Sequence, residues 1–272
     1  MLANEIGQRE KNTHGANLVP EWGIAIGARV VSIPYGVAED DNVSDFVPKL
    51  YFEGEYLYLR GEYGGLRFFE QDNYSASILG RYRYFDIPKQ YQREFHGTNI
   101  DMGLQLEYLL KPNLPLQIEL LSDSDGNSYG NVNLVYQVDY NDFDIDFNRT
   151  FRYKSGEFNN LYYGFNIDDI GSDLDIKMGA EARYHIFSNL YFLGEVDVNI
   201  LGNHTYQSEL TDSRFETEYY LGVGFFNNKK QQEYLTLPEN HYLRLAYGEG
   251  QHRPILVGLF MERRKKTNTI ID

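Results

Sequence analysis

Ionisable side chains recur at every second position along much of this chain. In residues 173–187, for example, Lys177, Glu181 and Arg183 share one parity, and most of the positions between them are apolar or small. Successive side chains of a β-strand point to opposite faces, so charges at this spacing would line one surface together. The positions predicted to share this charged surface are Arg81, Arg83, Asp101, Gln105, Glu107, Glu119, Asp144, Asp146, Arg152, Lys177, Glu181, Arg183, Glu195, Asp197, Glu216 and Glu218.

Acidic and basic residues are mixed on this surface, and two kinds of chemistry are open to it. Opposite charges could pair across a narrow lumen and fill it with side chains. Left unpaired, the same residues could line a path for ions, and the excess of acid would favour cations. The mixture of signs favours the filled lumen, and the open pore is the alternative.

Hydrolytic chemistry would need a serine and a histidine side by side with a third, orienting residue. His185 and Ser188 are three positions apart, but they straddle a predicted turn and should face different ways. His96 and His204 lie in predicted loops without a matching serine pattern. A lipid hydrolase is therefore the least favoured function, and no catalytic residue is predicted.

Metal and cofactor sites are likewise not predicted. Residues 123–127 resemble the start of a calcium loop, but Ser128 stands where such a loop needs glycine. Leu134 stands where it needs glutamate. A hairpin turn is the better interpretation of this segment.

The elements that would carry the charged surface are long alternating strands. Residues 98–110 alternate apolar and polar side chains throughout, and the pattern returns in residues 143–153, 174–186, 190–200 and 215–225. Strands of about ten alternating residues joined by short turns are typical of outer-membrane β-barrels. The predicted fold is therefore an all-β, closed antiparallel transmembrane barrel.

Composition agrees with a barrel that crosses a membrane. The chain has 272 residues, of which 24 are Tyr and 17 are Phe, and such aromatics form the interfacial girdles of membrane barrels. Mean hydropathy is −0.51, and no apolar run approaches the roughly 20 residues that a membrane helix needs. The net charge of −15 argues against a nucleic-acid partner.

Turn residues divide the barrel into about twelve strands, with ten possible because residues 47–70 are short and ambiguous. The predicted strands are residues 22–32, 47–53, 55–62, 66–70, 74–85, 98–110, 114–121, 130–139, 143–153, 173–187, 190–200 and 215–226. Residues 34–46, 86–97, 122–129 and 201–214 are predicted outer loops. An even strand count also requires residues 154–171 to form one outer loop rather than a spanning strand.

Three regions follow from this division. Residues 1–21 are predicted to be a polar, disordered leader, residues 22–226 the barrel, and residues 227–272 a polar, basic periplasmic tail. The tail ends in the basic run Arg263, Arg264, Lys265 and Lys266. A solvated tail is the simpler interpretation, and contact with anionic lipid or an envelope protein is the alternative.

Short glycine-aromatic motifs in a fixed order carry a family resemblance. They are Trp22-Gly23-Ile24 at the start, Tyr51-Phe52-Glu53-Gly54, Asp101-Met102-Gly103-Leu104, Tyr162-Tyr163-Gly164-Phe165 and Gly222-Val223-Gly224-Phe225-Phe226 at the close. In this order the chain resembles the MipA/OmpV family of Gram-negative outer-membrane proteins. The resemblance departs at the end, because the family usually stops at the last strand and 46 of the 272 residues here follow Phe226.

The resemblance implies location, partners and function. It implies a barrel in the outer membrane of a Gram-negative bacterium, in contact with its lipid and lipopolysaccharide. One member of the family is a scaffold that joins a murein-degrading lytic transglycosylase to a murein synthase, and others are described as porin-like. We therefore expect a structural or scaffolding protein of the cell envelope. A narrow, weakly cation-preferring channel is the alternative.

Overall fold

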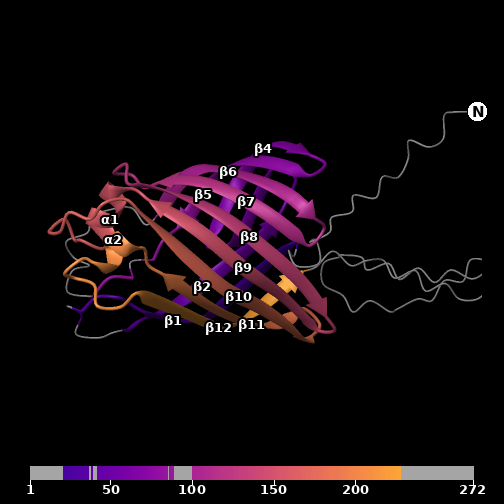
Figure 1. The fold of residues 1–272 in the computed structure, drawn as a ribbon. Helices are drawn as coiled ribbons and strands as arrows, with labels where there is room; N and C mark the ends of the chain where they lie inside the picture. Colours follow the sequence, from indigo (N-terminus) through magenta and orange to yellow (C-terminus); the bar gives the residue numbers. More distant parts are fainter. Residues whose placement is uncertain (1–20, 37, 39–41, 85, 89–99, 228–272) are drawn as a thin grey trace, which may run out of the picture. The chain divides into compact units, whose positions relative to one another are not determined.

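Twelve strands close into one antiparallel barrel in the computed structural model of the chain (Figure 1). The structure describes residues 21–36, 38, 42–84, 86–88 and 100–227. Each strand pairs with its neighbours in sequence, and β1 pairs with β12 to close the ring. The strands are β1 (Trp22–Ser32), β2 (Asn42–Glu53), β3 (Leu57–Gly61), β4 (Tyr63–Gln71), β5 (Tyr74–Tyr82), β6 (Ile100–Lys111), β7 (Leu114–Ser122), β8 (Ser128–Tyr140), β9 (Phe143–Lys154), β10 (Asp173–Phe187), β11 (Leu190–Ile200) and β12 (Phe215–Asn227).

The predicted closed barrel and its count of twelve strands are confirmed, which removes the ten-strand alternative. β10 and β11 have the predicted bounds. The leader and the tail, including Arg263, Arg264, Lys265 and Lys266, lie outside the described residues apart from Glu21 and Asn227.

Three predicted boundaries are wrong by three residues or more, one of them the start of β4, expected at residue 66 and observed at Tyr63. Residues 34–46 were expected to form a loop, but β2 begins at Asn42, because Val43 and Val47 continue the inward apolar positions of the strand and pair with β1. β5 was expected to reach Phe85, but its ladder with β6 ends at the pair Tyr82↔Ile100. Arg83 therefore lies beyond the strand rather than in it.

The outward face of the barrel is apolar, as a surface in contact with lipid must be. Leu106, Phe147 and Leu221 are 57%, 49% and 59% exposed although they lie within strands. Aromatic pairs such as Phe143–Tyr184 and Tyr74–Tyr108 join neighbouring strands near one end of the barrel. This arrangement corresponds to the apolar band and aromatic girdle of membrane barrels.

The two ends of the barrel differ in their connections. One end, the turn end, has the short connections 54–56, 72–73, 112–113, 141–142 and 188–189. The backbones of Asn141 and Ser188 there have positive φ, which tight two-residue hairpins require. The other end, the loop end, has the longer connections 33–41, 83–99, 123–127, 155–172 and 201–214. The exception on this side is the hairpin of β3 and β4, whose strands are joined by Glu62 alone. Because bacterial barrels keep short turns in the periplasm, we assign the loop end to the outside.

The loop end contains the larger of two clusters of buried apolar residues, the smaller being Ala25, Val47, Leu193, Tyr220 and Phe226 inside the barrel. Residues 154–171, predicted to be one loop, contain the short helix α1 (Gly156–Tyr162) and no strand beyond Lys154. The hydroxyl of Ser155 caps α1 by accepting the N–H of Phe158. A second helix, α2 (Asn203–Tyr206), lies in the connection 201–214. No helix among the described residues is long and apolar enough to cross a membrane.

Buried aromatic side chains from α1 fill the loop end of the barrel. Phe158 packs on Tyr129 of β8 with ring centroids 5.2 Å apart, and Tyr163 stacks on Tyr35 at 6.2 Å. The hydroxyl of Tyr35 donates to the carbonyl of Tyr162 at 2.7 Å. The chain thus places an aromatic core across the lumen at this end.

The wall is lower at the hairpin of β3 and β4 than elsewhere. The β2–β3 ladder ends at the pair Leu50↔Gly61, so the part of β2 from Asn42 to Lys49 pairs with β1 alone among the described strands. Pro48 lies within this one-sided segment. A proline lacks the N–H that a second ladder would need, so it suits an edge.

The two faces of β9 allow a direct test of the register. Replacing Phe147 by arginine places a charge in lipid, which should lower the free energy of unfolding by about 2–4 kcal/mol. Asn148→Arg, one residue along, should have a much smaller effect, because Asn148 faces the interior with its amide 3.4 Å from Asp197. Urea titration of the barrel folded into lipid vesicles measures both. Equal effects would mean that the strand is shifted by one residue.

The orientation of the barrel can be tested with single cysteines, because the native chain has none. Ile167→Cys, at a loop-end position that is 76% exposed, should react with a membrane-impermeant maleimide on intact cells. Asp142→Cys, at an exposed position of the turn end, should react only after the outer membrane is permeabilised. The reverse pattern would invert the assignment of the two ends.

Candidate functional site in the barrel interior

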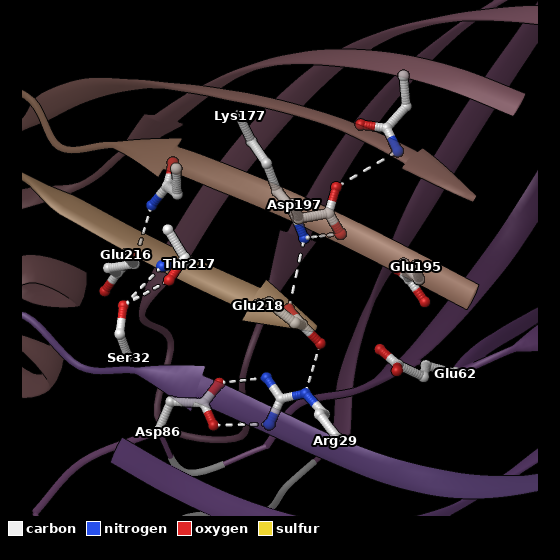
Figure 2. A network of polar contacts seen from close by, with 12 residues as sticks. Arg29, Ser32, Glu62, Asp86, Lys177, Glu195, Asp197, Glu216, Thr217 and Glu218 are labelled. Atoms are coloured by element: carbon white, nitrogen blue, oxygen red, sulfur yellow. Dashed lines mark hydrogen bonds and ion pairs between the residues drawn. The ribbon is translucent and has the colours of Figure 1, made fainter. Parts of the chain in front are cut away.

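Inward-facing charged residues meet across the lumen in paired networks. The first, the Glu218 network, comprises Arg29, Asp86, Lys177, Asp197 and Glu218 (Figure 2). The Arg29 guanidinium donates to Asp86 at 2.7 and 2.6 Å and, through Nε, to Glu218. The ammonium of Lys177 lies 3.0 Å from Asp197 and 3.7 Å from Glu218. Glu218 therefore bridges two cations that come from opposite sides of β12.

Close backbone approach makes one of these contacts possible. Asp197 on β11 lies against Gly179 of β10, where a Cβ atom would lie 1.7 Å from its Oδ1 atom. Any side chain at position 179 would therefore displace the carboxylate from Lys177.

Lys49 joins strands that are not neighbours in the wall. Its Nζ atom lies 2.5 Å from Glu195 on β11 and 3.6 Å from Glu62. It also sits over the ring of Tyr220 at 4.3 Å. Because β1 and β12 separate β2 from β11, the Lys49–Glu195 contact can form only across the interior.

A second network, the Glu119 network, lies on β5–β8. Glu119 is 1% exposed and accepts from Arg81 at 3.0 Å, from Gln105 at 3.0 Å and from Asn131 at 2.8 Å. The hydroxyl of Tyr58 on β3 donates to Gln105 at 2.8 Å, again across the interior. Glu119 is thus a buried carboxylate with its charge fully compensated.

Glu107 has its own partners nearby. It lies 3.3 Å from the guanidinium of Arg60 and accepts the amide of Gln117 at 2.9 Å. Arg60 also pairs with Glu53 at 3.2 Å, which connects the interior to the turn end.

Asp101 is fully buried beside the loop-end core. It accepts the hydroxyl of Tyr129 at 2.8 Å and lies 2.8 Å from Arg83. Arg83 stacks over the ring of Tyr162 at 3.9 Å. Arg152 donates to Asn131 at 2.9 Å and has no carboxylate within 4.0 Å among the described residues.

Six of the predicted charged positions form no ion pair among the described residues: Arg152, Glu216 and four residues toward the turn end. Asp144, Asp146, Glu181 and Arg183 lie toward the turn end, and none has an oppositely charged group within 4.0 Å in the described part of the chain. Arg183 instead lies 5.9 Å from the ring of Phe226. Glu216 is also without an ion pair, but it accepts from Asn199 at 2.6 Å and from Tyr163 at 3.3 Å.

Several important residues were missed by the sequence analysis. Lys154 and Asp175 form an ion pair at 2.7 Å with side chains that are each 1% exposed. Lys154 also reaches Thr205, and Asp175 accepts the N–H of Gly202 at 2.9 Å, so the pair anchors the α2 connection. Lys154 shares the parity of Arg152 and Asp175 that of Lys177, so parity alone could have found both residues. Arg29 lies on β1, where no position was predicted to line the charged surface.

Asp123 shows how the loop end is fixed outside the strands. Burial alone would raise the pKa of its carboxyl, but hydrogen bonds from Asn127, Tyr162 and the Asp125 backbone lower the pKa below its ordinary value. The carboxylate therefore stays ionised and holds both the turn 123–127 and α1.

Histidines in the described segments do not form a serine–histidine pair. Nε2 of His185 lies 2.8 Å from the carbonyl oxygen of Ser188, and Nδ1 of His204 lies 2.8 Å from that of Ser172. His96 lies outside the described residues. Within the described ranges, no group of three or more His, Asp or Glu side chains is placed to hold a metal ion.

Comparison with known proteins identifies the family. A family model described as "MltA-interacting protein MipA" matches residues 24–226. No curated protein sequence matches the chain.

Solved structures with a similar arrangement include a bacterial polysaccharide outer membrane secretin (10% identity, TM-score 0.39, covering 76% of this chain and 99% of that one). Another is the CymD monoaromatic hydrocarbon channel, with 10% identity and a TM-score of 0.35, covering 80% of this chain and 91% of that one. A third is the outer membrane protein OprG from Pseudomonas aeruginosa, with 8% identity and a TM-score of 0.29, covering 78% of this chain and 98% of that one. These scores are too low to support any functional conclusion, and the fold assignment rests on the strand register. With the family model matching nearly the whole barrel, the chain belongs to the MltA-interacting protein MipA family and is a β-barrel protein of the Gram-negative outer membrane.

Proposed function

We propose that this barrel is a structural protein of the cell envelope that holds a murein lytic transglycosylase at the periplasmic side of the outer membrane. The single observation that carries the proposal is the occupied interior, in which ion pairs join strands that are not neighbours in the wall. A lumen crossed by compensated charges favours a rigid support over a path for solutes.

The family description supports the choice of partner. It names an interaction with MltA, a lytic transglycosylase, and we extend that interaction to this chain. A murein synthase is the second proposed partner, by family resemblance alone. Lipid and lipopolysaccharide would surround the outward apolar face.

The alternative is a narrow channel with a weak preference for cations. It is favoured by the acids near the turn end, where Asp144, Asp146 and Glu181 have no cation within 4.0 Å among the described residues. We place it second because the aromatic core of α1 and the Glu218 network lie at the loop end.

Conductance separates the two functions. The full chain, purified and inserted into planar bilayers at pH 7, should give no reproducible current steps, because ion pairs and the loop-end core occupy the interior. A porin reconstituted in the same lipid serves as the positive control. Reproducible steps with cation preference would reject the structural function in favour of the channel.

Partner binding tests the scaffold function and the tail together. The full chain, immobilised in detergent, should bind the soluble domain of a lytic transglycosylase. Replacing Arg263, Arg264, Lys265 and Lys266 by alanine should weaken this binding at least tenfold if the basic run contacts the partner. Lys229→Ala with Lys230→Ala, a basic pair elsewhere in the same tail, is the matched control and should bind like the native chain.

Absence of binding by the native chain would overturn the scaffold proposal. Equal binding by the four-fold variant would retain the scaffold but remove the tail from the contact.

A further inference from the structure

A cavity of about 160 Å³ lies inside the loop end, beside the aromatic residues of α1. We propose that it binds a small zwitterionic solute, such as a free amino acid or a dipeptide. The solute's carboxylate would be held by Arg83 and Arg152, and its ammonium by Glu216. This inference goes beyond the scaffold function and does not depend on it.

The cavity is small, and its lining is rich in charged and aromatic side chains. Roughly 10–15 Å³ is enough to hold one water molecule, so a cavity of about 160 Å³ has room for a small solute. Its walls combine charged groups of both signs with the rings of Tyr84, Tyr162 and Tyr163. Aromatic walls with a few convergent polar groups are typical of ligand sites.

The cationic wall contains guanidinium N–H groups that have no hydrogen-bond partner. Nε and Nη1 of Arg83 are buried and make no hydrogen bond, although Nη2 lies 2.8 Å from Asp101 and 3.5 Å from Asp123. Arg152 donates through Nε to Asn131 and has no carboxylate within 4.0 Å in the described segments. Buried donors without partners are rare in proteins, and a carboxylate would satisfy those of Arg83 while pairing with the half-buried Arg152.

The acidic wall has one carboxylate without a direct ion pair, because Lys154 acts on Glu216 only from beyond 4.0 Å. Asp86, Asp197 and Glu218 also line the cavity, but Arg29 and Lys177 already pair with them. Glu216 has only the neutral partners Asn199 and Tyr163, and no Lys, Arg or His lies within 4.0 Å among the residues described. An ammonium group would supply the missing opposite charge.

Both charges of the ligand are needed to satisfy the site. A simple anion would leave Glu216 uncompensated, and a simple amine would do the same to Arg152. A buried charge without a partner is strongly unfavourable, so a solute that carries both charges fits where either ion alone does not. Glu216 on β12 and Arg152 on β9 come from strands separated by β10 and β11, which leaves space between them for the solute.

Isothermal titration of the purified full chain at pH 7 with a matched set of probes tests the proposal. Alanine and alanyl-alanine carry both charges, alaninamide lacks the carboxylate, and N-acetylalanine lacks the ammonium. We expect at least one of the zwitterions to bind at least tenfold more tightly than either singly charged analogue. Equal binding of all four probes, or none by either zwitterion, would overturn the proposal.

Two variants assign the charges to residues. Glu216→Gln should weaken zwitterion binding at least tenfold and abolish the discrimination against N-acetylalanine. Arg152→Gln should also weaken zwitterion binding at least tenfold, and it should abolish the discrimination against alaninamide. A merely structural role would weaken all probes together, so the change of selectivity is the decisive readout.

Matched controls come from the same elements. Arg149→Gln lies on β9 but faces outward, and Glu157→Gln lies on α1 at an exposed position, so both should bind like the native chain. Heat-modifiable gel mobility shows that each variant is folded. Folded Glu216→Gln and Arg152→Gln barrels with unchanged selectivity would reject this site.

Discussion

The structure depends on one constraint: in lipid, every backbone N–H and C=O group must find its partner within the protein. A strand cannot meet this requirement alone, and a sheet meets it only when its two edges join. The ladder between β1 and β12, which runs from Trp22↔Asn227 to Ser32↔Thr217, makes that joint. Once the ring is closed, the parity of each strand decides which side chains face lipid and which face the interior.

Closure of the barrel encloses the inward-facing polar side chains in a narrow lumen. Their contacts with one another follow from this lack of space. A charge in the interior is costly unless another charge or a hydrogen bond compensates it. The Glu218 and Glu119 networks provide this compensation with residues that lie far apart in the sequence, such as Arg29 with Asp86 and Tyr58 with Gln105. The interior therefore acts as a polar core, while the apolar core of α1 is displaced to one end.

Much of the fold could be predicted from the sequence, because apolar and polar residues alternate with a period of two along nearly the whole length of each strand. Alternation and turn residues gave the closed barrel, its twelve strands and the bounds of β10 and β11. The start of β2 was missed because residues 34–41 read as a polar loop that runs directly into it.

The contacts of the candidate site were harder to predict, because parity says which face a residue occupies but not its partner. Lys49 meets Glu195 because its side chain reaches through the interior past β1 and β12, and that reach is not written in the sequence of β2. No local pattern marks Asp86, since its place beside Arg29 depends on how the chain leaves β5.

The low hairpin of β3 and β4 has a consequence for the surrounding lipid. β3 has five residues and β10 has fifteen, so the rim of the barrel is not level. At about 3.3 Å per residue and a tilt near 40°, β2 rises on the order of 15–20 Å above its last pair with β3. The outer leaflet must meet a much shorter wall beside this hairpin than beside β10. A bilayer adapts to a short apolar span by thinning. We therefore expect the bilayer around this protein to be uneven in thickness and thinnest beside β3 and β4.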